Sequence, residues 1–197
     1  MKTVFNFFSG IILFGLLIAC NSNQNQKIDP ETYSDLTEKG NTISNQAQGV
    51  LLANVSSAMQ QGGPEYAIAF CNLEASALID SLSAANNCTI SRVSSKNRNP
   101  GNALGDEQEK VLWNLYEKKL QSGNAGDTLI LNDETLVYYK PIKTAMPACL
   151  NCHGTPGSDI APATLEKIQE LYPNDKATGY NLNDFRGLWR IAFSATE

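Results

Sequence analysis

The spacing of hydrophobic and polar positions predicts a helical first half of the chain and a mixed second half. Between residues 29 and 61, apolar residues return every three, four or seven positions, as they do on one face of a helix. Gly62-Gly63 ends this run, and Pro64 suits the first turn of a second helix that continues to about Ala85. The pattern therefore predicts two long N-terminal helices.

Further along the chain, short apolar runs are separated by turn residues. We predict four strands, at residues 87–93, 127–131, 136–142 and 188–194. Along the last of these, Trp189, Ile191 and Phe193 share one face. Two shorter helices are also predicted, one that opens at Asp106 and closes at Gly123, and one over residues 162–171. Two long helices followed by a small mixed region imply an α+β fold.

The first twenty residues form a separate pattern. Lys2 precedes a short apolar run that is typical of an export signal and is too short for a comfortable membrane span. Its end, Leu17-Ile18-Ala19-Cys20, resembles the lipobox of bacterial lipoproteins. This resemblance implies that residues 1–19 are removed as a signal peptide and that Cys20 carries the acyl chains. An uncleaved anchor with an incidental cysteine is the alternative, and both interpretations place the rest of the chain outside the cytoplasm.

The rest of the chain suits one domain behind a tether. Residues 20–29 are polar and are expected to form the tether, and residues 30–197 are long enough for a single core. Loss of Lys2 leaves 14 basic against 20 acidic residues and a net charge of about −6, which disfavours nucleic acid as a partner. Asn21 offers no acidic retention signal after Cys20, which favours anchoring at the periplasmic side of an outer membrane.

The cysteines carry the strongest chemical signal. Apart from Cys20, the chain has Cys71, Cys88, Cys149 and Cys152, and two disulfides would be the simplest use of four cysteines in an oxidising compartment. The last pair, however, belongs to Cys149-Leu150-Asn151-Cys152-His153, which matches the C-x-x-C-H attachment motif of c-type haem. In such a motif both thiols bond to the porphyrin, and the next histidine binds iron. We therefore predict one covalent haem c.

Other uses of this motif are less consistent with the sequence. A zinc site needs a fourth protein ligand, and the chain has neither a second C-x-x-C nor a second histidine. A thioredoxin-like pair normally opens a helix in a βαβ unit, whereas Gly154 follows this motif at once. A haem-free thiol–disulfide protein that uses Cys149 and Cys152 stays open as the alternative function.

The residues alone leave several candidates for the second iron ligand. His153 is the only histidine, and none of the 44 residues after it is methionine, while Met146 lies too close to the motif. Met59, Cys71, Cys88 and an open position remain. Cys71 lies between two alanines on one helix face, which would let a flat macrocycle approach, although free cysteines are often simply buried.

Basic residues also gather in one segment. Arg92, Lys96 and Arg98 lie in the segment from Ser91 to Pro100 and could bind the haem propionates, because the planar guanidinium suits carboxylates. Solvated loop charges are the equal alternative.

Several separated segments together resemble one known family, that of haem c-binding, PAS-like, sensor-type domains long catalogued as a domain of unknown function. Its members occur alone in the periplasm or as input domains of histidine kinases and chemoreceptors. The resemblance runs from about Leu36 to the C-terminus and depends on four segments, residues 67–71 with Ala75, residues 92–102, residues 139–142 leading into 149–154, and residues 172–180 with Arg186-Gly187.

This resemblance implies a PAS-like antiparallel sheet flanked by helices, with the haem against it. It also implies that Cys71 is the sixth iron ligand opposite His153, and that the segment from Arg92 to Asn99, which includes Arg98, belongs to the haem pocket. We expect an anionic thiolate to favour ferric iron, so that reduction releases Cys71 and admits a small gas such as CO or NO.

Three functional classes then compete. A redox or gas sensor would change ligation and signal to a partner protein, an electron carrier would keep both ligands, and an enzyme such as a peroxidase would need a distal base that a second histidine usually supplies. The enzyme is therefore the least favoured. The partner protein is not identifiable from the sequence, and a homodimer is one option because PAS-like domains often pair through N-terminal helices.

Overall fold

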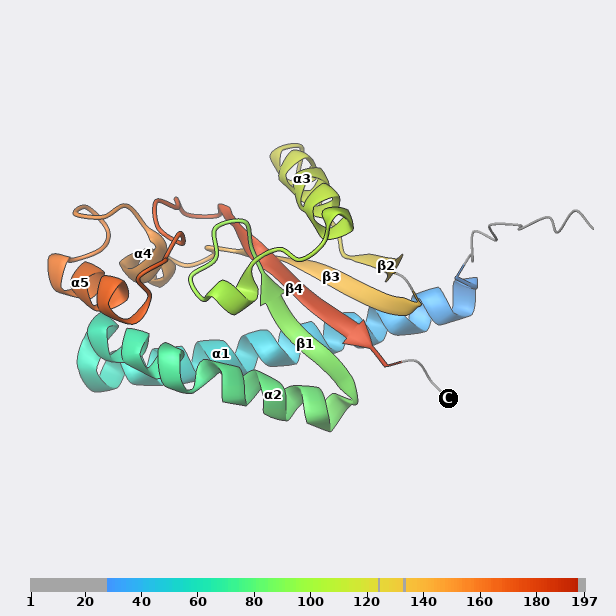
Figure 1. Cartoon of the computed structure of the whole chain (residues 1–197), viewed down its shortest axis with the longest axis horizontal. Coiled ribbons are helices and arrows are strands. Elements are labelled where there is room, and N and C mark those ends of the chain that lie inside the picture. Colours follow the sequence, from blue (N-terminus) through green and yellow to red (C-terminus); the bar gives the residue numbers. More distant parts are fainter. Residues whose placement is uncertain (1–27, 124, 133, 195–197) are drawn as a thin grey trace, which may run out of the picture.

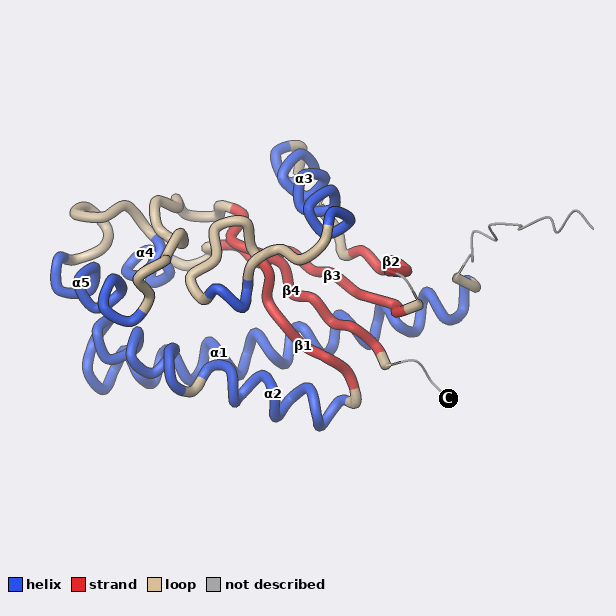
Figure 2. The backbone as a smooth tube through the Cα atoms, viewed as in Figure 1, coloured by secondary structure: helices blue, strands red, loops and turns tan. Residues whose placement is uncertain are grey.

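The structure is a computed structural model that describes residues 28–123, 125–132 and 134–194. The predicted signal peptide and the lipidation site at Cys20 lie outside the described residues. Within them, the fold is α+β, as predicted, and consists of helices packed on both faces of a four-stranded sheet (Figures 1 and 2).

The N-terminal helices match the predicted pair. Helix α1 (Pro30–Leu73) is capped by Asp29, whose side chain accepts from the Thr32 amide, and is interrupted where Gly62 and Gly63 leave helical geometry. Gly63 has φ of +72°, which a glycine adopts without strain. The chain turns back at this break, so that the residues after Gly63 and helix α2 (Ala75–Asn86) run beside the first arm (Figure 1). An additional break at Glu74 separates α1 from α2 and was not predicted.

The sheet has the strand order β1-β4-β3-β2 with all neighbours antiparallel. The strands are β1 (Cys88–Val93), β2 (Thr128–Asn132), β3 (Thr135–Lys143) and β4 (Phe185–Phe193). Helices α1 and α2 cover one face and helix α3 (Glu107–Gln121) lies over the other (Figure 1). The four predicted strands are all present, and their observed ends differ from the predicted ones by at most a few residues.

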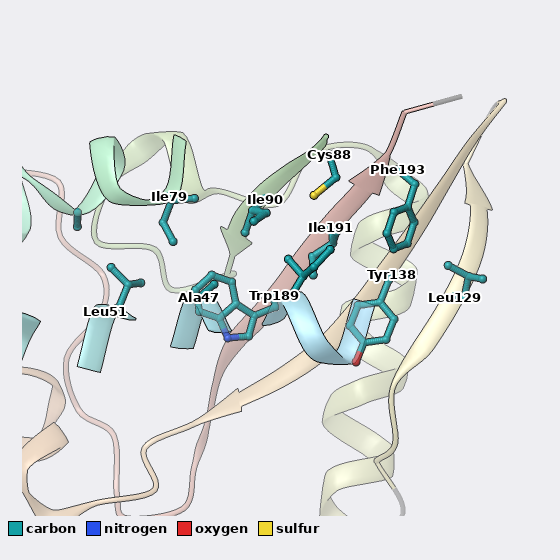
Figure 3. Packing of buried hydrophobic residues seen from close by; sticks show 12 residues of the cluster. Ala47, Leu51, Ile79, Cys88, Ile90, Leu129, Tyr138, Trp189, Ile191 and Phe193 are labelled. Carbon is teal, nitrogen blue, oxygen red and sulfur yellow. The ribbon is translucent and has the colours of Figure 1, made fainter. Parts of the chain in front are cut away.

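The main core lies between the sheet and the helical pair. Alternate residues of β4 point toward α1, and Trp189, Ile191 and Phe193 are buried there as their spacing predicted (Figure 3). Ala47 and Ile79 bring the two helical arms onto this surface. Trp189 also donates from Nε1 to the Gln48 side chain at 2.9 Å, which satisfies its polar atom inside the core.

The opposite face of the sheet is partly covered by α3. Leu112, Trp113 and Tyr116 pack there against residues of β1, β3 and β4, and Asp106 caps the helix by accepting from the Glu109 amide at 2.8 Å. Val111 and Leu115, which the helical pattern also includes, are exposed instead.

Two short helices close one end of the molecule. Helix α4 (Pro147–His153) and helix α5 (Pro162–Leu171) lie beside the turn in α1, together with the 3-10 turn η1 (Pro100–Asn102) between β1 and α3 (Figure 2). Ile68 of α1 packs with Ile160, Ile168 and Tyr172 in a third, smaller core. The sequence predicted α5 at its observed position but not α4, because seven residues are too few to show a helical period.

No single described helix is long and apolar enough to cross a membrane, although α1 and α2 taken together, bent by 47° where they meet, would pass on length and composition alone.

Candidate functional site

The C-x-x-C-H motif forms the whole C-terminal part of α4. Pro147 opens the helix, His153 is its last residue, and Gly154 ends it. Cys149 and Cys152 are three residues apart on this helix and therefore lie on neighbouring positions of one face. Both are half-buried and free, as is Cys71, while Cys88 is free but buried. The helix thus presents two unpaired thiols and an imidazole within a single turn.

Gly154 is required by close packing at the end of the motif. A Cβ atom at this position would overlap Asp159 and would lie 2.7 Å from the Leu150 carbonyl oxygen. Asp159 occupies this space because its carboxylate accepts from the Thr155 amide at 2.8 Å. The turn after α4 is therefore fixed by its own residues.

The orientation of the His153 ring is set by a backbone bond. Its Nδ1 lies 2.8 Å from the carbonyl oxygen of Ala177, and since a carbonyl can only accept, Nδ1 carries the proton. Nε2 is then left as the basic nitrogen, which is the arrangement found in metal-binding histidines. Burial lowers the pKa of His153 well below its ordinary value, and the nearby cations Arg186 and Arg98 lower it further. The imidazole is accordingly neutral.

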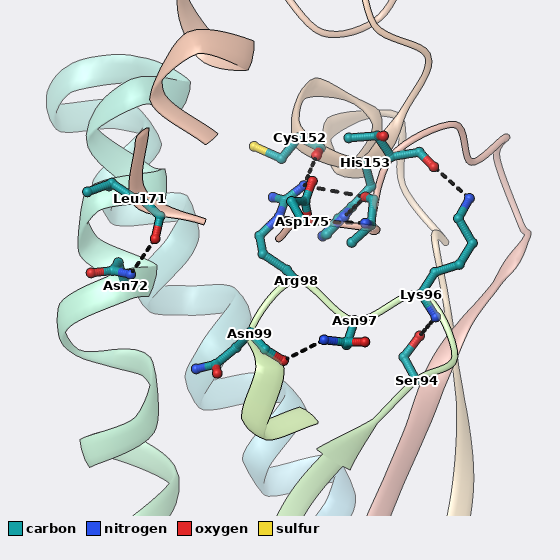
Figure 4. A network of polar contacts seen from close by, with 12 residues as sticks. Asn72, Ser94, Lys96, Asn97, Arg98, Asn99, Cys152, His153, Leu171 and Asp175 are labelled. Carbon is teal, nitrogen blue, oxygen red and sulfur yellow. Dashed lines mark hydrogen bonds and ion pairs between the residues drawn. The ribbon is translucent and has the colours of Figure 1, made fainter. Parts of the chain in front are cut away.

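Arg98 joins the loop that contains Asp175 and Ala177 to α4 (Figure 4). Its Nε pairs with Asp175 at 3.0 Å, and its Nη2 donates to the Cys152 carbonyl oxygen at 2.6 Å. The same Nη2 also donates to the Ala177 carbonyl oxygen at 3.4 Å, so this carbonyl accepts from both His153 and Arg98. A single ion pair therefore holds the position of the motif and of the carbonyl that orients its imidazole.

Cys71 lies near the motif thiols. It follows Ile68 by one helical turn, and Ile68 belongs to the small core against which Cys152 packs. Burial raises the pKa of Cys71, while Arg92 and Arg98 lower it. Burial likewise raises the pKa of Cys152 to about 11, and Arg98 lowers it while a charge on Cys71 would raise it. The two thiols therefore lie within electrostatic range of each other, on facing helices.

The remaining basic residues surround His153. Lys96 donates to the Thr178 carbonyl oxygen at 2.6 Å and lies over the Tyr180 ring, which meets the His153 ring edge-on at 6.2 Å. Arg186 also lies over Tyr180, with its guanidinium carbon 5.5 Å from the ring centre. Of the four ion pairs among the described residues, only that of Arg98 with Asp175 belongs to this cluster. The site is therefore strongly cationic.

The structure brings together most of the residues that the sequence singled out and separates others. Cys71, Arg92, Arg98, Cys149, Cys152 and His153 converge at one end of the molecule. Cys88, a weaker ligand candidate, is instead buried in the main core beside Phe193, at the far end of β1 (Figure 3). No cluster of three histidine, cysteine or acidic side chains suited to a metal ion exists among the described residues.

Three contributors were given no role by sequence reasoning. Asp175, Ala177 and Arg186 reach the site from the loop after α5 and from the start of β4. The family resemblance included their segments, but nothing in local spacing indicates that an alanine carbonyl orients the histidine. Such contacts arise only when the chain closes over long sequence distances.

A cavity elsewhere on the molecule does not compete with this site. It measures about 490 Å³, lies on the face of the sheet that α3 partly covers, and is bordered by Asp106 and Arg190. Arg190 is already engaged there, since its Nε lies 3.3 Å from the buried Glu109 carboxylate. The nucleophilic and metal-binding atoms are gathered around α4 instead.

The comparisons with known proteins agree with the fold. The family model described as Tll0287-like matches residues 24–194. A solved structure, that of the cyanobacterial haem protein Tll0287, superimposes with a TM-score of 0.63 at 19% sequence identity, over 86% of this chain and 99% of that one. No curated protein matches the chain.

Proposed function

Because this chain belongs to the Tll0287-like family, we propose that it is a c-type haem protein whose haem is bound covalently through Cys149 and Cys152. The solved structure to which it is similar is that of a haem protein. The observation that carries the proposal is the bond between His153 Nδ1 and the Ala177 carbonyl, which leaves Nε2 available beside two free thiols on one short helix. Haem c would supply an iron centre able to change oxidation state.

The residues around α4 fit this cofactor. The two thiols are three residues apart and unpaired, as attachment requires, and His153 is neutral, as an iron ligand must be. Ala177 would fix the ring orientation, while Arg98 and Asp175 would hold α4 in place. The surrounding positive charge would suit a cofactor that carries carboxylates.

We further propose Cys71 as the second axial ligand. It lies between Ala67 and Ala75, both buried small residues, and Arg92 and Arg98 favour its thiolate form against the effect of burial. The absorption spectrum of the oxidised Cys71→Ala variant should change, whereas Cys88→Ala, which alters only the main core, should leave it unchanged. A Cys71→Ala spectrum identical to that of the unaltered protein would exclude this ligand.

For the physiological role, we propose redox or gas sensing, or electron transfer, by an exported protein anchored through a lipid on Cys20. Carbon monoxide added to the reduced protein distinguishes the two classes. A sensor that releases Cys71 would bind the gas with a large change in its spectrum, whereas a carrier that keeps both ligands would not. Radiolabelled palmitate incorporation, lost in Cys20→Ala, tests the anchor separately.

The haem-free thiol–disulfide alternative would use Cys149 and Cys152 as a redox pair. Burial raises the pKa of Cys152 to about 11, so this second cysteine would not be the nucleophile of the pair. To separate the two functions, the protein is produced with a haem-maturation system and its alkaline pyridine spectrum is recorded. A haemochrome of the two-thioether type supports the proposal, and Cys149→Ser and Cys152→Ser should each shift it. A protein without any haemochrome would contradict it.

A further inference from the structure

The cationic cluster around His153 contains more positive charge than its own residues balance. Arg92, Lys96, Arg98 and Arg186 contribute four cations, and Asp175 is the carboxylate that pairs with one of them. The pKa of Arg186 is lowered by burial and by repulsion from Arg98 and Arg92. Because an unpaired charge is costly to remove from water, such a cluster requires anionic partners.

Most of the Arg98 guanidinium is already occupied by partners within the protein. Its Nε and Nη2 already bind Asp175, and Nη2 also binds the Cys152 and Ala177 carbonyls. Asp175 therefore balances the charge of this guanidinium, and its Nε–Nη2 edge is occupied. In the structure Arg98 positions α4, whereas the sequence suggested that it would bind a haem propionate.

Arg186 is only partly satisfied. Its Nη1 donates to the Ser94 hydroxyl at 3.1 Å and to the Lys96 carbonyl oxygen at 3.2 Å, which fixes the guanidinium in place. Its Nε is buried and has no hydrogen-bond partner within the described part of the chain. Buried donors without partners are rare, and one at a ligand site indicates a missing acceptor.

Arg92 lies on β1, within electrostatic range of both proposed iron ligands. Its charge acts on the Cys71 thiol, and it also acts on the His153 imidazole. Burial lowers the pKa of Arg92, and its guanidinium lies over the Trp189 ring, 5.9 Å from the ring centre. Arg92 is thus a second guanidinium near these ligands, and no ion pair among the described residues involves it.

We propose that Arg92 and Arg186 bind the two haem carboxylates, and that Arg98 takes no part in that contact. The inference rests on the proposed function, because it assigns partners to the cofactor proposed for this site. Two guanidinium groups near the same imidazole match a ligand with two carboxylates, and planar forks bind carboxylates with two parallel hydrogen bonds.

Infrared spectroscopy on isotope-labelled protein tests this assignment directly. Haem whose carboxylates carry ¹³C is incorporated into the unaltered protein and into Arg92→Gln, Arg186→Gln and Arg186→Lys. Lys118→Gln, which removes an exposed charge from α3, is the matched control. The labelled carboxylate bands should shift in both glutamine variants, and the midpoint potential should fall because a cation near the iron is lost. Arg186→Lys should restore the potential in part.

The inference is overturned if the labelled bands and the potential of both glutamine variants match those of Lys118→Gln. Failure of the proposed function is distinguishable, because the unaltered protein would then carry no labelled haem at all. If Arg186→Gln fails to fold, Arg92→Gln and Arg186→Lys decide the question, since a lysine cannot reproduce the two-pronged contact and its band must still differ.

Discussion

The Nδ1 atom of His153 lies 2.8 Å from the carbonyl oxygen of Ala177, and this bond determines which ring nitrogen is free to bind a metal. The same carbonyl accepts from Arg98, whose charge Asp175 neutralises. The environment of the proposed iron ligand is therefore adjusted by residues that do not touch the iron.

Replacing the carboxylate behind this arrangement should change the potential of the haem-loaded protein. Asp175→Asn leaves the Arg98 charge uncompensated beside His153, and an uncompensated positive charge disfavours ferric iron. The midpoint potential should therefore rise, and the shift should correspond to an energy of order 1 kcal/mol. Asp35→Asn, on the exposed side of α1, is the control and should leave the potential unchanged. Equal potentials in the two variants would show that Asp175 has only a structural role.

The packing of α1 on the sheet depends on a glycine. A Cβ atom at Gly40 would overlap the Tyr138 ring, with both Cδ atoms only 2.7 Å away. Gly40→Ala should therefore destabilise the protein by about 1–3 kcal/mol in urea unfolding, although alanine is the better helix former. Gly49→Ala on the same helix meets no atom within 4 Å and should stabilise it by about 0.5–1 kcal/mol. A neutral Gly40→Ala would contradict the close approach seen here.

The free energy of unfolding in alkali should depend on the ionisation of the Tyr116 hydroxyl. Its hydroxyl donates to one acceptor and contacts the Gly126 carbonyl, the Thr128 hydroxyl and the Tyr139 carbonyl, and burial raises its pKa from 10.0 to about 12. The folded state therefore holds this proton more tightly than the unfolded state does. The resulting stability is complete below pH 10 and is lost as the pH rises to about 12.

The free energy of unfolding measured from pH 8 to 12 checks this expectation. Tyr116→Phe should lower stability by about 1–2 kcal/mol near neutral pH and should show a shallower decline in alkali, because one buried hydroxyl fewer must ionise on unfolding. A decline as steep in Tyr116→Phe as in the unaltered protein would assign the alkaline loss to other groups.

In protein produced without haem maturation, Cys152 should be a poor nucleophile. Burial raises the pKa of Cys152 to about 11, so little thiolate exists at pH 7.5. Alkylation by iodoacetamide, followed by peptide mass spectrometry, should be slow at this residue in the folded protein and several-fold faster in urea. Rapid alkylation at pH 7.5 without urea would favour the thiol–disulfide alternative instead.

The sequence was sufficient for elements with a long or strongly marked pattern. Asp106 and Gly123 delimit α3, Gly62-Gly63 divides the helical pair, and the alternation of Trp189, Ile191 and Phe193 identifies the buried face of β4. In each case a local physical requirement, such as a cap, a backbone turn or a two-residue period, appears directly in neighbouring residues.

Other features depend on contacts that no local pattern contains. The sequence did not predict α4. Its position depends on Arg98, in the loop that follows β1, and on hydrogen bonds from the backbone amides of residues 179 and 180. Nor did it show that Val111 and Leu115 of α3 would be exposed, because the helix packs on the sheet through Leu112, Trp113 and Tyr116 instead. The roles of Asp175 and Ala177 likewise follow only from chain closure.

The intact mass of the mature protein tests the central claim most directly. Protein co-produced with a haem-maturation system and measured under denaturing conditions should carry the added mass of one haem, and a Cys149→Ala, Cys152→Ala double variant should lack it. A mature protein whose denatured mass is that of the polypeptide and its lipid alone would contradict the account.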